Sequence, residues 1–570
     1  MQTPFFHIEI PTQAQDHKIL ANILPGADSL AVSEIAAQFN GLTVVVTNDT
    51  RSAVRLEKEL AQLSPLNVTF FPDWETLPYD SFSPHQDIIS ARLSALFHLQ
   101  QRKQGIFILP IATLMQRVCP PSYLQHRVLL INKGDRFVIE TLRLQLEKSG
   151  YRAVEQVLEH GEYAVRGALL DLFPMGSAVP FRLDFFDDEI DSIRTFDVDT
   201  QRTLDEINSI NLLPAHEFPT DDKGIEFFRA QFRETFGEIR RDPEHIYQQI
   251  SKGTLISGIE YWQPLFFSEM VTLFDYLPEQ TLFVDMENNQ MQGERFYQDA
   301  KQRYEQRKVD PMRPLLSPEK LWLNVDEVNR RLKSYPRITF KAEKVRSSVR
   351  QKNLPVAALP EVTIQSQQKE PLGQLRQFIE HFKGNILFIV ETEGRRETLL
   401  SLLAPLKLKP KQIHTLAQAT EEKLALMVSP LEHGFIIEQD VPLAIICESE
   451  LLGERVQQRQ RDKSRTVNPD TLIRNLAELQ IGQPVVHLDH GVGRYGGLVS
   501  LENGGIKAEY LLLNYANDSK LYVPVASLHL ISRYVGGADE TAPLHKLGSE
   551  AWGKARSKAA EKIRDVAAEL

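Results

Sequence analysis

The stretch LTVVVT at residues 42–47 decides the fold of the first part of the chain. It is a short β-branched run of the kind found in buried strands, and a helical pattern precedes it at residues 30–39. The alternation continues with a helix near residues 55–60, a strand at residues 68–71, a helix at residues 88–101 and a strand at residues 106–110. Regular alternation of strands and helices predicts a mostly parallel α/β sheet.

The pattern changes between residues 126 and 209. Short strands at residues 164–171, 180–186 and 190–197 follow one another, joined by turns rich in acidic residues, Gly and Pro. This spacing predicts an inserted, mostly antiparallel α+β domain. Longer helices return after Leu212, so residues 1–125 and 210–345 are expected to form one α/β domain that the insert splits.

The remaining chain divides into five expected segments, which make the protein multi-domain. They are a linker at residues 346–368, a second small α/β domain at residues 369–452, a basic linker at residues 453–474, a small β-barrel at residues 475–545 and a linker helix at residues 546–570. The barrel is predicted from four or five short strands and from the turn sequence Asn503-Gly504-Gly505.

Composition narrows the functional classes. The chain has 570 residues and a net charge of -11, which argues against broad, non-specific binding to DNA or to an anionic membrane. No run approaches the roughly 18–20 apolar residues that span a bilayer, so no membrane partner is expected. Its two cysteines, Cys119 and Cys447, cannot form a disulfide framework or a zinc site, which favours a reducing, cytoplasmic location.

Two glycine-rich strings resemble nucleotide-binding motifs. Residues 548–555, GSEAWGKA, match a phosphate loop except that Ala555 lacks the hydroxyl that binds magnesium, and Glu550 would repel phosphate. Residues 491–496, GVGRYG, match a dinucleotide fingerprint but precede a strand instead of a helix, so a tight barrel turn is the preferred interpretation. We therefore expect no catalytic residue and no cofactor in this chain.

Two further strings have plain structural interpretations. Residues 443–450, LAIICESE, are read as a parallel core strand that ends in a solvated loop. His487 and His490 have poor geometry for a shared metal and are read as surface or turn residues, so no metal site is expected.

The insert holds the most informative residues. Arg182, Asp184 and Phe186 alternate and are expected to share one face of a strand. Arginines and aromatic rings are the residue types that anchor protein interfaces. The alternative is a surface salt bridge between Arg182 and Asp184 with Phe186 in the core, and the pattern alone does not decide between the two.

Four long strings resemble a known family. They are FPDWETLPYDSFSPHQDIISARLSAL at residues 71–96, EHGEYAVRGALLDLFPMGS at residues 159–177, FRLDFFDDEIDSIRTFD at residues 181–197 and HLDHGVGRYGG at residues 487–497. On these strings the insert is similar to the second domain of the excision-repair protein UvrB. The whole chain resembles the N-terminal half of the bacterial transcription-repair coupling factors.

The resemblance implies a factor for transcription-coupled DNA repair that recognises RNA polymerase stalled at damage. It implies that the insert recruits UvrA through Arg166, Arg182 and Phe186. A Tudor-like barrel would bind the polymerase β subunit through Leu498, Val499 and Leu501. ATP, Mg²⁺ and duplex DNA would be used by motor domains that follow the helix near residue 551, and that translocation would displace the polymerase.

The chain also departs from UvrB. Where UvrB carries a phosphate loop, residues 24–30 read LPGADSL, without Gly-Lys-Ser/Thr. Residues 74–84 are too short for the DNA-wedging hairpin of UvrB. We therefore expect a degenerate, helicase-type α/β domain that is a docking scaffold and not an enzyme. The alternatives are a degenerate ATPase that uses residues 548–555, or a DNA-binding module at the basic run of residues 455–465, which could equally be an exposed linker.

Overall fold

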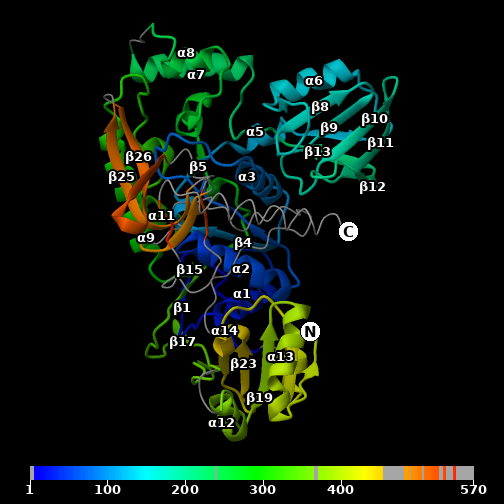
Figure 1. Cartoon of the computed structure of the whole chain (residues 1–570), viewed down its shortest axis with the longest axis vertical. Helices are drawn as coiled ribbons and strands as arrows, with labels where there is room; N and C mark the ends of the chain where they lie inside the picture. Colours follow the sequence, from blue (N-terminus) through cyan, green and yellow to red (C-terminus); the bar gives the residue numbers. More distant parts are fainter. Residues whose placement is uncertain are drawn as a thin grey trace. The chain divides into compact units, whose positions relative to one another are not determined.

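The computed structural model describes residues 5–237, 241–364, 370–452, 481–487, 490–503, 506–524, 531–533 and 544–546. The chain divides into two compact units, Met1–Val456 and Gln457–Leu570 (Figure 1). The first unit holds three sheets of six or seven strands, and the second holds one five-stranded sheet. The protein is therefore a mixed α/β protein with several sheets, as the sequence predicts.

The first domain is built on a seven-stranded sheet in the order β17-β1-β16-β15-β2-β4-β3. Every neighbouring pair in it is parallel, which confirms the predicted parallel sheet. The strands are β1 (His17–Ala21), β2 (Leu42–Thr47), β3 (Val68–Phe70), β4 (Gly105–Pro110), β15 (Thr281–Met286), β16 (Arg337–Phe340) and β17 (Gln351–Asn353). All six residues of β2 are buried, because helices cover both faces of a parallel sheet.

Several helices complete the first domain. They are α1 (Ala27–Gln38), α2 (Thr50–Leu63), α3 (Gln86–Leu99), α4 (Ile111–Leu114), α5 (Pro121–Gln125), α7 (Asp222–Phe236), α8 (Ile246–Ser251), α9 (Asn289–Arg307), α10 (Pro318–Leu321) and α11 (Val325–Leu332), with 3₁₀ turns η1 (Ile259–Phe266) and η2 (Leu273–Asp275). The helix α2 begins at its cap Asp49, which accepts a hydrogen bond from the Ser52 amide at 2.8 Å. It buries one face, with Leu56 and Leu60.

The insert is a six-stranded sheet in the order β12-β11-β10-β9-β8-β7. Its strands are β7 (Arg152–Ala153), β8 (Glu162–Arg166), β9 (Leu169–Leu172), β10 (Phe181–Phe186), β11 (Glu189–Phe196) and β12 (Thr203–Ile207). All its described pairs are antiparallel except β7 with β8. The helix α6 (Ile139–Lys148) packs on one face through Leu142 and Leu146, and β6 (Leu129–Asn132) pairs with β13 (Ser209–Leu212) where the chain enters and leaves.

The third domain has a sheet in the order β18-β22-β23-β19-β21-β20. Its strands are β18 (Val356–Ala357), β19 (Asn385–Val390), β20 (Lys411–Gln412), β21 (Leu424–Val428), β22 (Phe435–Ile437) and β23 (Leu443–Cys447), with helices α12 (Gly373–His381), α13 (Glu393–Leu403) and α14 (Glu448–Leu452). The strand β23 is fully buried and parallel to β19, which confirms the interpretation of residues 443–447 as a core strand. The solvated loop expected after it is wrong, because residues 448–452 form α14.

The segment expected as a linker at residues 346–368 contains two short strands. The strand β17 extends the sheet of the first domain, and β18 pairs with β22 of the third domain. The backbone of this segment therefore has hydrogen-bond partners in both sheets, and the two domains are joined by paired chain over part of its length.

The second unit is an antiparallel sheet in the order β27-β26-β25-β24-β28. Its strands are β24 (Pro484–His487), β25 (Gly491–Asn503), β26 (Ile506–Asn514), β27 (Lys520–Pro524) and β28 (Ile531–Arg533). A small core includes Tyr495, Leu511 and Tyr515. Among the described residues, β27 and β28 end the sheet without pairing to each other, so the expected closed, Tudor-like barrel is not observed there.

The interpretation of residues 491–496 as a tight turn is wrong, because they lie inside β25. The strand has an irregularity between Tyr495 and Gly497, and Gly497 has a φ of 106°. A Cβ at Gly493 would lie 3.0 Å from the ring of Tyr515, and one at Gly496 would lie 3.0 Å from Leu512. These glycines therefore permit a bent strand and close packing.

Candidate docking surfaces

Two hairpin tips of the insert lie next to each other. One tip joins β8 to β9 and contains Arg166 and Gly167, whose φ is 62°. The other joins β10 to β11 and follows Phe186. The amide of Phe185 donates a 2.9 Å hydrogen bond to the carbonyl oxygen of Ala168, which ties the two tips together. Arg166 and Phe186 are therefore brought to the same end of the sheet.

Phe186 lies on the surface and not in the core. Its ring is 80% exposed, whereas the preceding Phe185 is 5% exposed and belongs to the insert core. Strand alternation causes this difference, because successive side chains of β10 point to opposite faces. The structure thus decides against the interpretation that buries Phe186.

Arg182 is held by Asp171 and not by Asp184. Its Nε and Nη2 atoms donate to the two carboxylate oxygens of Asp171 at 2.7 and 2.9 Å. The guanidinium also lies over the ring of Phe196, 5.0 Å from its centre. The hydrogen bond to Asp171 raises the pKa of Arg182. The sequence pattern did not single out Asp171. The strand register places Asp171 opposite Arg182 across β9 and β10, and this register is the signal that points to the ion pair.

Arg166 is exposed, and its Nη2 donates to the carbonyl oxygen of Glu155 at 2.9 Å. This one hydrogen bond leaves most of its guanidinium donors to solvent. Of the three predicted residues, Arg166 and Phe186 present their side chains at the tips, while Arg182 lies further back on β10 in a fixed ion pair.

A second surface lies on β25. Leu498 is 39% exposed and Val499 is half-buried. Leu501 pairs with Ala508 of β26, but its side chain lies outside the described part. Because β24 pairs only with residues 491–494, the described strands leave residues 497–503 of β25 with β26 as their one neighbour. Such an edge can accept a further strand.

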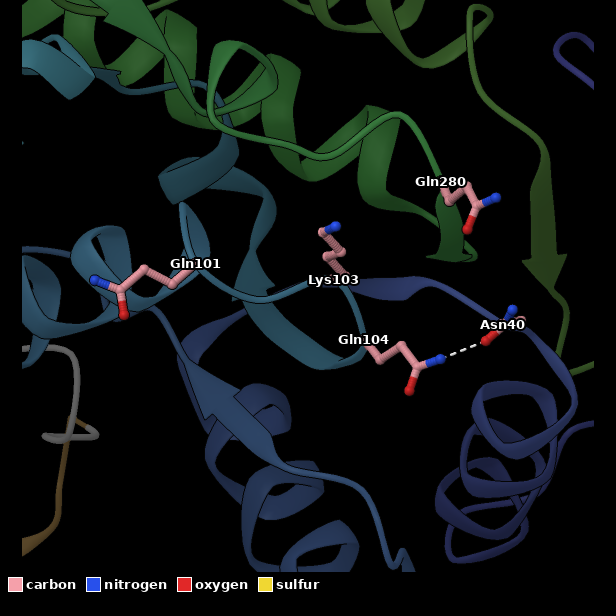
Figure 2. A pocket seen from close by; sticks show the side chains of 5 residues that line it. All are labelled: Asn40, Gln101, Lys103, Gln104 and Gln280. Carbon is pink, nitrogen blue, oxygen red and sulfur yellow. Dashed lines mark hydrogen bonds between the residues drawn. The ribbon is translucent and has the colours of Figure 1, made fainter.

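A polar depression lies at the amino end of the seven-stranded sheet of the first domain. Figure 2 shows its lining residues, Asn40, Gln101, Lys103, Gln104 and Gln280. The amide of Gln104 donates to the side-chain oxygen of Asn40. These residues precede or flank the amino ends of β2, β4 and β15, whereas ligands of parallel α/β sheets bind at the carboxyl ends of strands. The depression therefore lies at the wrong end of the sheet for a nucleotide-binding site.

The remaining sequence predictions concern ATP, DNA, metal and membrane binding. Residues 548–555 and 455–465, which carry the ATPase and DNA-binding alternatives, lie outside the described residues. His487 is buried at the end of β24, so its interpretation as a surface or turn residue is wrong. Its ring centre lies 4.7 Å from that of His490. Within the described ranges, no cluster of three or more His, Cys, Asp or Glu is arranged to hold a metal. In the same ranges no helix is long and apolar enough to cross a membrane.

Three family models match separate parts of the chain. The UvrB interaction domain matches residues 129–218, the MFD, D3 domain matches residues 378–451 and the CarD-like/TRCF RID domain matches residues 479–535. The first match covers the insert with Arg166 and Phe186. The third covers the described β24–β28 sheet.

Curated relatives match the chain from end to end. It is 84% identical to the transcription-repair-coupling factor of Haemophilus influenzae, over 100% of the chain and 50% of that relative. It is 57% identical to that of Escherichia coli (99% and 49%) and 26% identical to that of Bacillus subtilis (97% and 48%). The chain spans about half the length of these relatives. It therefore belongs to the transcription-repair-coupling factor family, of which it represents an N-terminal portion.

Proposed function

We propose that this chain is the docking half of a transcription-coupled DNA repair factor. Its insert recruits the damage-recognition protein UvrA, and its β24–β28 sheet binds the β subunit of RNA polymerase. The observation that carries the proposal is the 80% exposed ring of Phe186 beside Arg166, inside the segment that matches the UvrB interaction domain. An exposed aromatic ring next to an exposed guanidinium has the composition of an interface anchor.

The three residues of the insert have different tasks in this proposal. Phe186 supplies apolar area that a partner can bury without any rearrangement of the insert. Arg166 supplies hydrogen-bond donors for carboxylates or carbonyls of the partner. Arg182 is fixed by Asp171 and also donates from Nη1 to the carbonyl oxygen of Gln201, so it meets a partner in a set orientation, which lowers the entropy lost on binding.

Substitution of Phe186 by Ala tests the UvrA surface. We expect the affinity for UvrA to fall by about 30-fold, which corresponds to about 2 kcal/mol for a buried anchor. The matched control is Leu130→Ala, which removes a 53% exposed side chain from β6 of the same insert and should leave the affinity unchanged. Surface plasmon resonance with purified UvrA gives both values, and equal affinities for the two variants would contradict the proposal.

The polymerase surface rests on the edge of β25 that the described strands leave unpaired. A strand of the polymerase β subunit can add to residues 497–503 by backbone hydrogen bonds, with Leu498, Val499 and Leu501 as side-chain contacts. The exposed Leu498 and the match to the RID domain support this assignment.

The substitution Leu498→Arg tests this edge. We expect polymerase binding to weaken by roughly 30-fold, because a charge would be buried without a partner in the complex. The control is Tyr522→Arg, which places the same charge at a 41% exposed position on β27, at the far edge of the sheet. A pull-down with the β subunit that is unaffected by Leu498→Arg, or equally weakened by Tyr522→Arg, would overturn the assignment.

ATP hydrolysis and DNA translocation are assigned to the other half of the full-length factor. There, Mg²⁺ and ATP would drive movement on duplex DNA and displace the stalled polymerase. For this chain we propose partner binding without hydrolysis, because residues 24–30 lack the Gly-Lys-Ser/Thr sequence of a phosphate loop.

A further inference from the structure

The loop of residues 22–26, between β1 and α1, occupies the position at which a sheet of this kind binds phosphate. Gly26 caps α1 with a φ of 84°. A Cβ at Gly26 would lie 2.3 Å from the carbonyl oxygen of His433, which belongs to the third domain. The backbone of the third domain therefore lies directly against this loop.

Asp28 occupies the N-terminal turn of α1 with its own carboxylate. One carboxylate oxygen accepts hydrogen bonds from the amides of Gly26 at 3.0 Å and Ser29 at 2.9 Å. The guanidinium of Arg55 donates to both oxygens of the same carboxylate. Helix-terminal amides and a guanidinium are the groups that hold phosphate in nucleotide-binding proteins. Here an internal anion engages both.

Glu59 continues this network into the third domain. Its side chain is fully buried, and one carboxylate oxygen accepts from Arg55 at 2.7 Å. The other oxygen accepts from the backbone amide of Glu432 at 3.1 Å. Burial opposes a charge on Arg55, but the carboxylates of Asp28 and Glu59 raise its pKa. The guanidinium therefore stays charged and connects the two acids.

Neighbouring contacts strengthen the same joint. The side chain of Gln62 donates to the carbonyl oxygen of Val428 at 2.9 Å. Leu30 and Val32 of α1 share one core cluster with Leu431 and Phe435 of the third domain. Apolar packing thus flanks the polar network, in which the side chains of Arg55 and Asp28 are only 15% and 10% exposed, so the loss of a partner is costly.

We propose that the third domain permanently covers the loop of residues 22–26, where a sheet of this kind binds phosphate. In this proposal the carboxylate of Asp28 takes the place of the phosphate. The network Asp28–Arg55–Glu59 then serves as the joint between the two domains instead of a ligand site. This role is independent of the docking surfaces, because none of its residues lies in the insert or in the β24–β28 sheet.

Hydrogen exchange in the full chain tests the joint. In Asp28→Ala, Arg55 loses one of its two carboxylate partners and keeps Glu59, and we expect the amides of residues 431–435 to exchange about tenfold faster. Amides of β19, in the centre of the third domain, should keep their rates. The control is Asp221→Ala, whose carboxylate likewise caps a helix, at the Gly224 amide, and pairs with Arg127, but in another part of the first domain. It should leave residues 431–435 unchanged.

Chemical rescue identifies the anion position. Sodium formate should slow the exchange of residues 431–435 in Asp28→Ala about threefold relative to sodium chloride of equal concentration, because formate restores a carboxylate beside Arg55. No formate-specific effect is expected in Asp221→Ala at these residues. Unchanged exchange in Asp28→Ala, or equal effects of formate and chloride, would overturn the proposal.

A milder variant keeps the proposal testable if Asp28→Ala does not fold. Glu59→Gln retains the shape of the side chain but turns an amide nitrogen or a neutral oxygen toward Arg55. The Glu432 amide should exchange about tenfold faster in this variant, with β19 unaffected. If the Glu432 amide exchanged at the same rate as in the parent protein, the proposed role of Glu59 in joining the two domains would be wrong.

Discussion

At the scale of residues, Arg166 and Arg182 differ in what they do for the folded insert. Arg182→Ala would leave Asp171, whose side chain is 3% exposed, without its cation, and we expect a loss of about 2 kcal/mol in local stability. Arg166→Ala should cost less than about 0.5 kcal/mol, because its side chain is exposed. Hydrogen exchange of the β9 and β10 amides measures both, and equal protection in the two variants would contradict the assigned roles.

The sequence predicts which residues share a face better than it predicts which face is buried. Alternation places Arg182 and Phe186 on the same face of the strand. The same pattern, however, also fits a strand that buries this face and exposes the opposite one. The decision comes from neighbouring strands, because Asp171 on β9 lies opposite Arg182 and the insert core takes Phe185. Cross-strand partners of this kind depend on register, which a single sequence does not specify.

At the scale of elements, the segment between β13 and α7 makes the insert sensitive to pH. The ring of His216 lies against Gly150 and stacks on Phe218, with ring centres 5.4 Å apart. Burial lowers the pKa of His216 from 6.5 to about 4. The unfolded chain therefore takes up the proton first. The free energy that the neutral His216 contributes to folding is present above pH 6.5 and is lost as the pH drops from 6.5 toward 4, by at most about 3 kcal/mol.

The variant His216→Phe checks this pH dependence. It keeps an aromatic ring against Phe218 but cannot take up a proton, so its stability should fall less between pH 6.5 and 4 than that of the parent chain. Urea unfolding followed by a probe in the insert gives the two profiles. Parallel profiles would show that another group is responsible for the acid sensitivity.

Elements of the first unit follow from local patterns more directly than those of the second. The run LTVVVT becomes the buried strand β2 because a β-branched, apolar run has no other favourable place in an α/β chain. The glycines of residues 491–497 are different, since the same residues can form a turn or a bent strand. Packing against Tyr515 and Leu512 selects the strand, and those contacts lie about 20 residues away.

At the scale of the whole molecule, the predicted split of the first domain depends on contacts between chain segments on either side of the insert. Sequence patterns indicated the return of helices after Leu212 but not the contacts that join the halves. Nor did they indicate that β17 and β18 extend two sheets or that Glu59 reaches Glu432. Such long-range pairings depend on the complete fold, because loop closure over many residues leaves no local signature.

The buried pair of Arg92 and Glu217 is the clearest of these contacts. Arg92 precedes the insert, Glu217 follows it, and their side chains are 2.5 Å apart and almost inaccessible to solvent. Arg92 also donates to the carbonyl oxygen of Pro72 and lies 4.4 Å from the ring centre of Phe71. Loss of Glu217 alone would leave a buried cation, so Glu217→Ala should destabilise the first domain by about 3–5 kcal/mol.

Removing both charges should be less harmful than removing one. In the double variant Arg92→Met/Glu217→Leu no buried charge is left unpaired, and we expect the first domain to recover at least about half of the stability that Glu217→Ala loses. Chemical unfolding followed by Trp fluorescence compares the three proteins, since Trp74 and Trp262 are buried in the same core cluster. If the double variant is less stable than Glu217→Ala, the pair itself holds the two halves together through attraction that exceeds its desolvation cost.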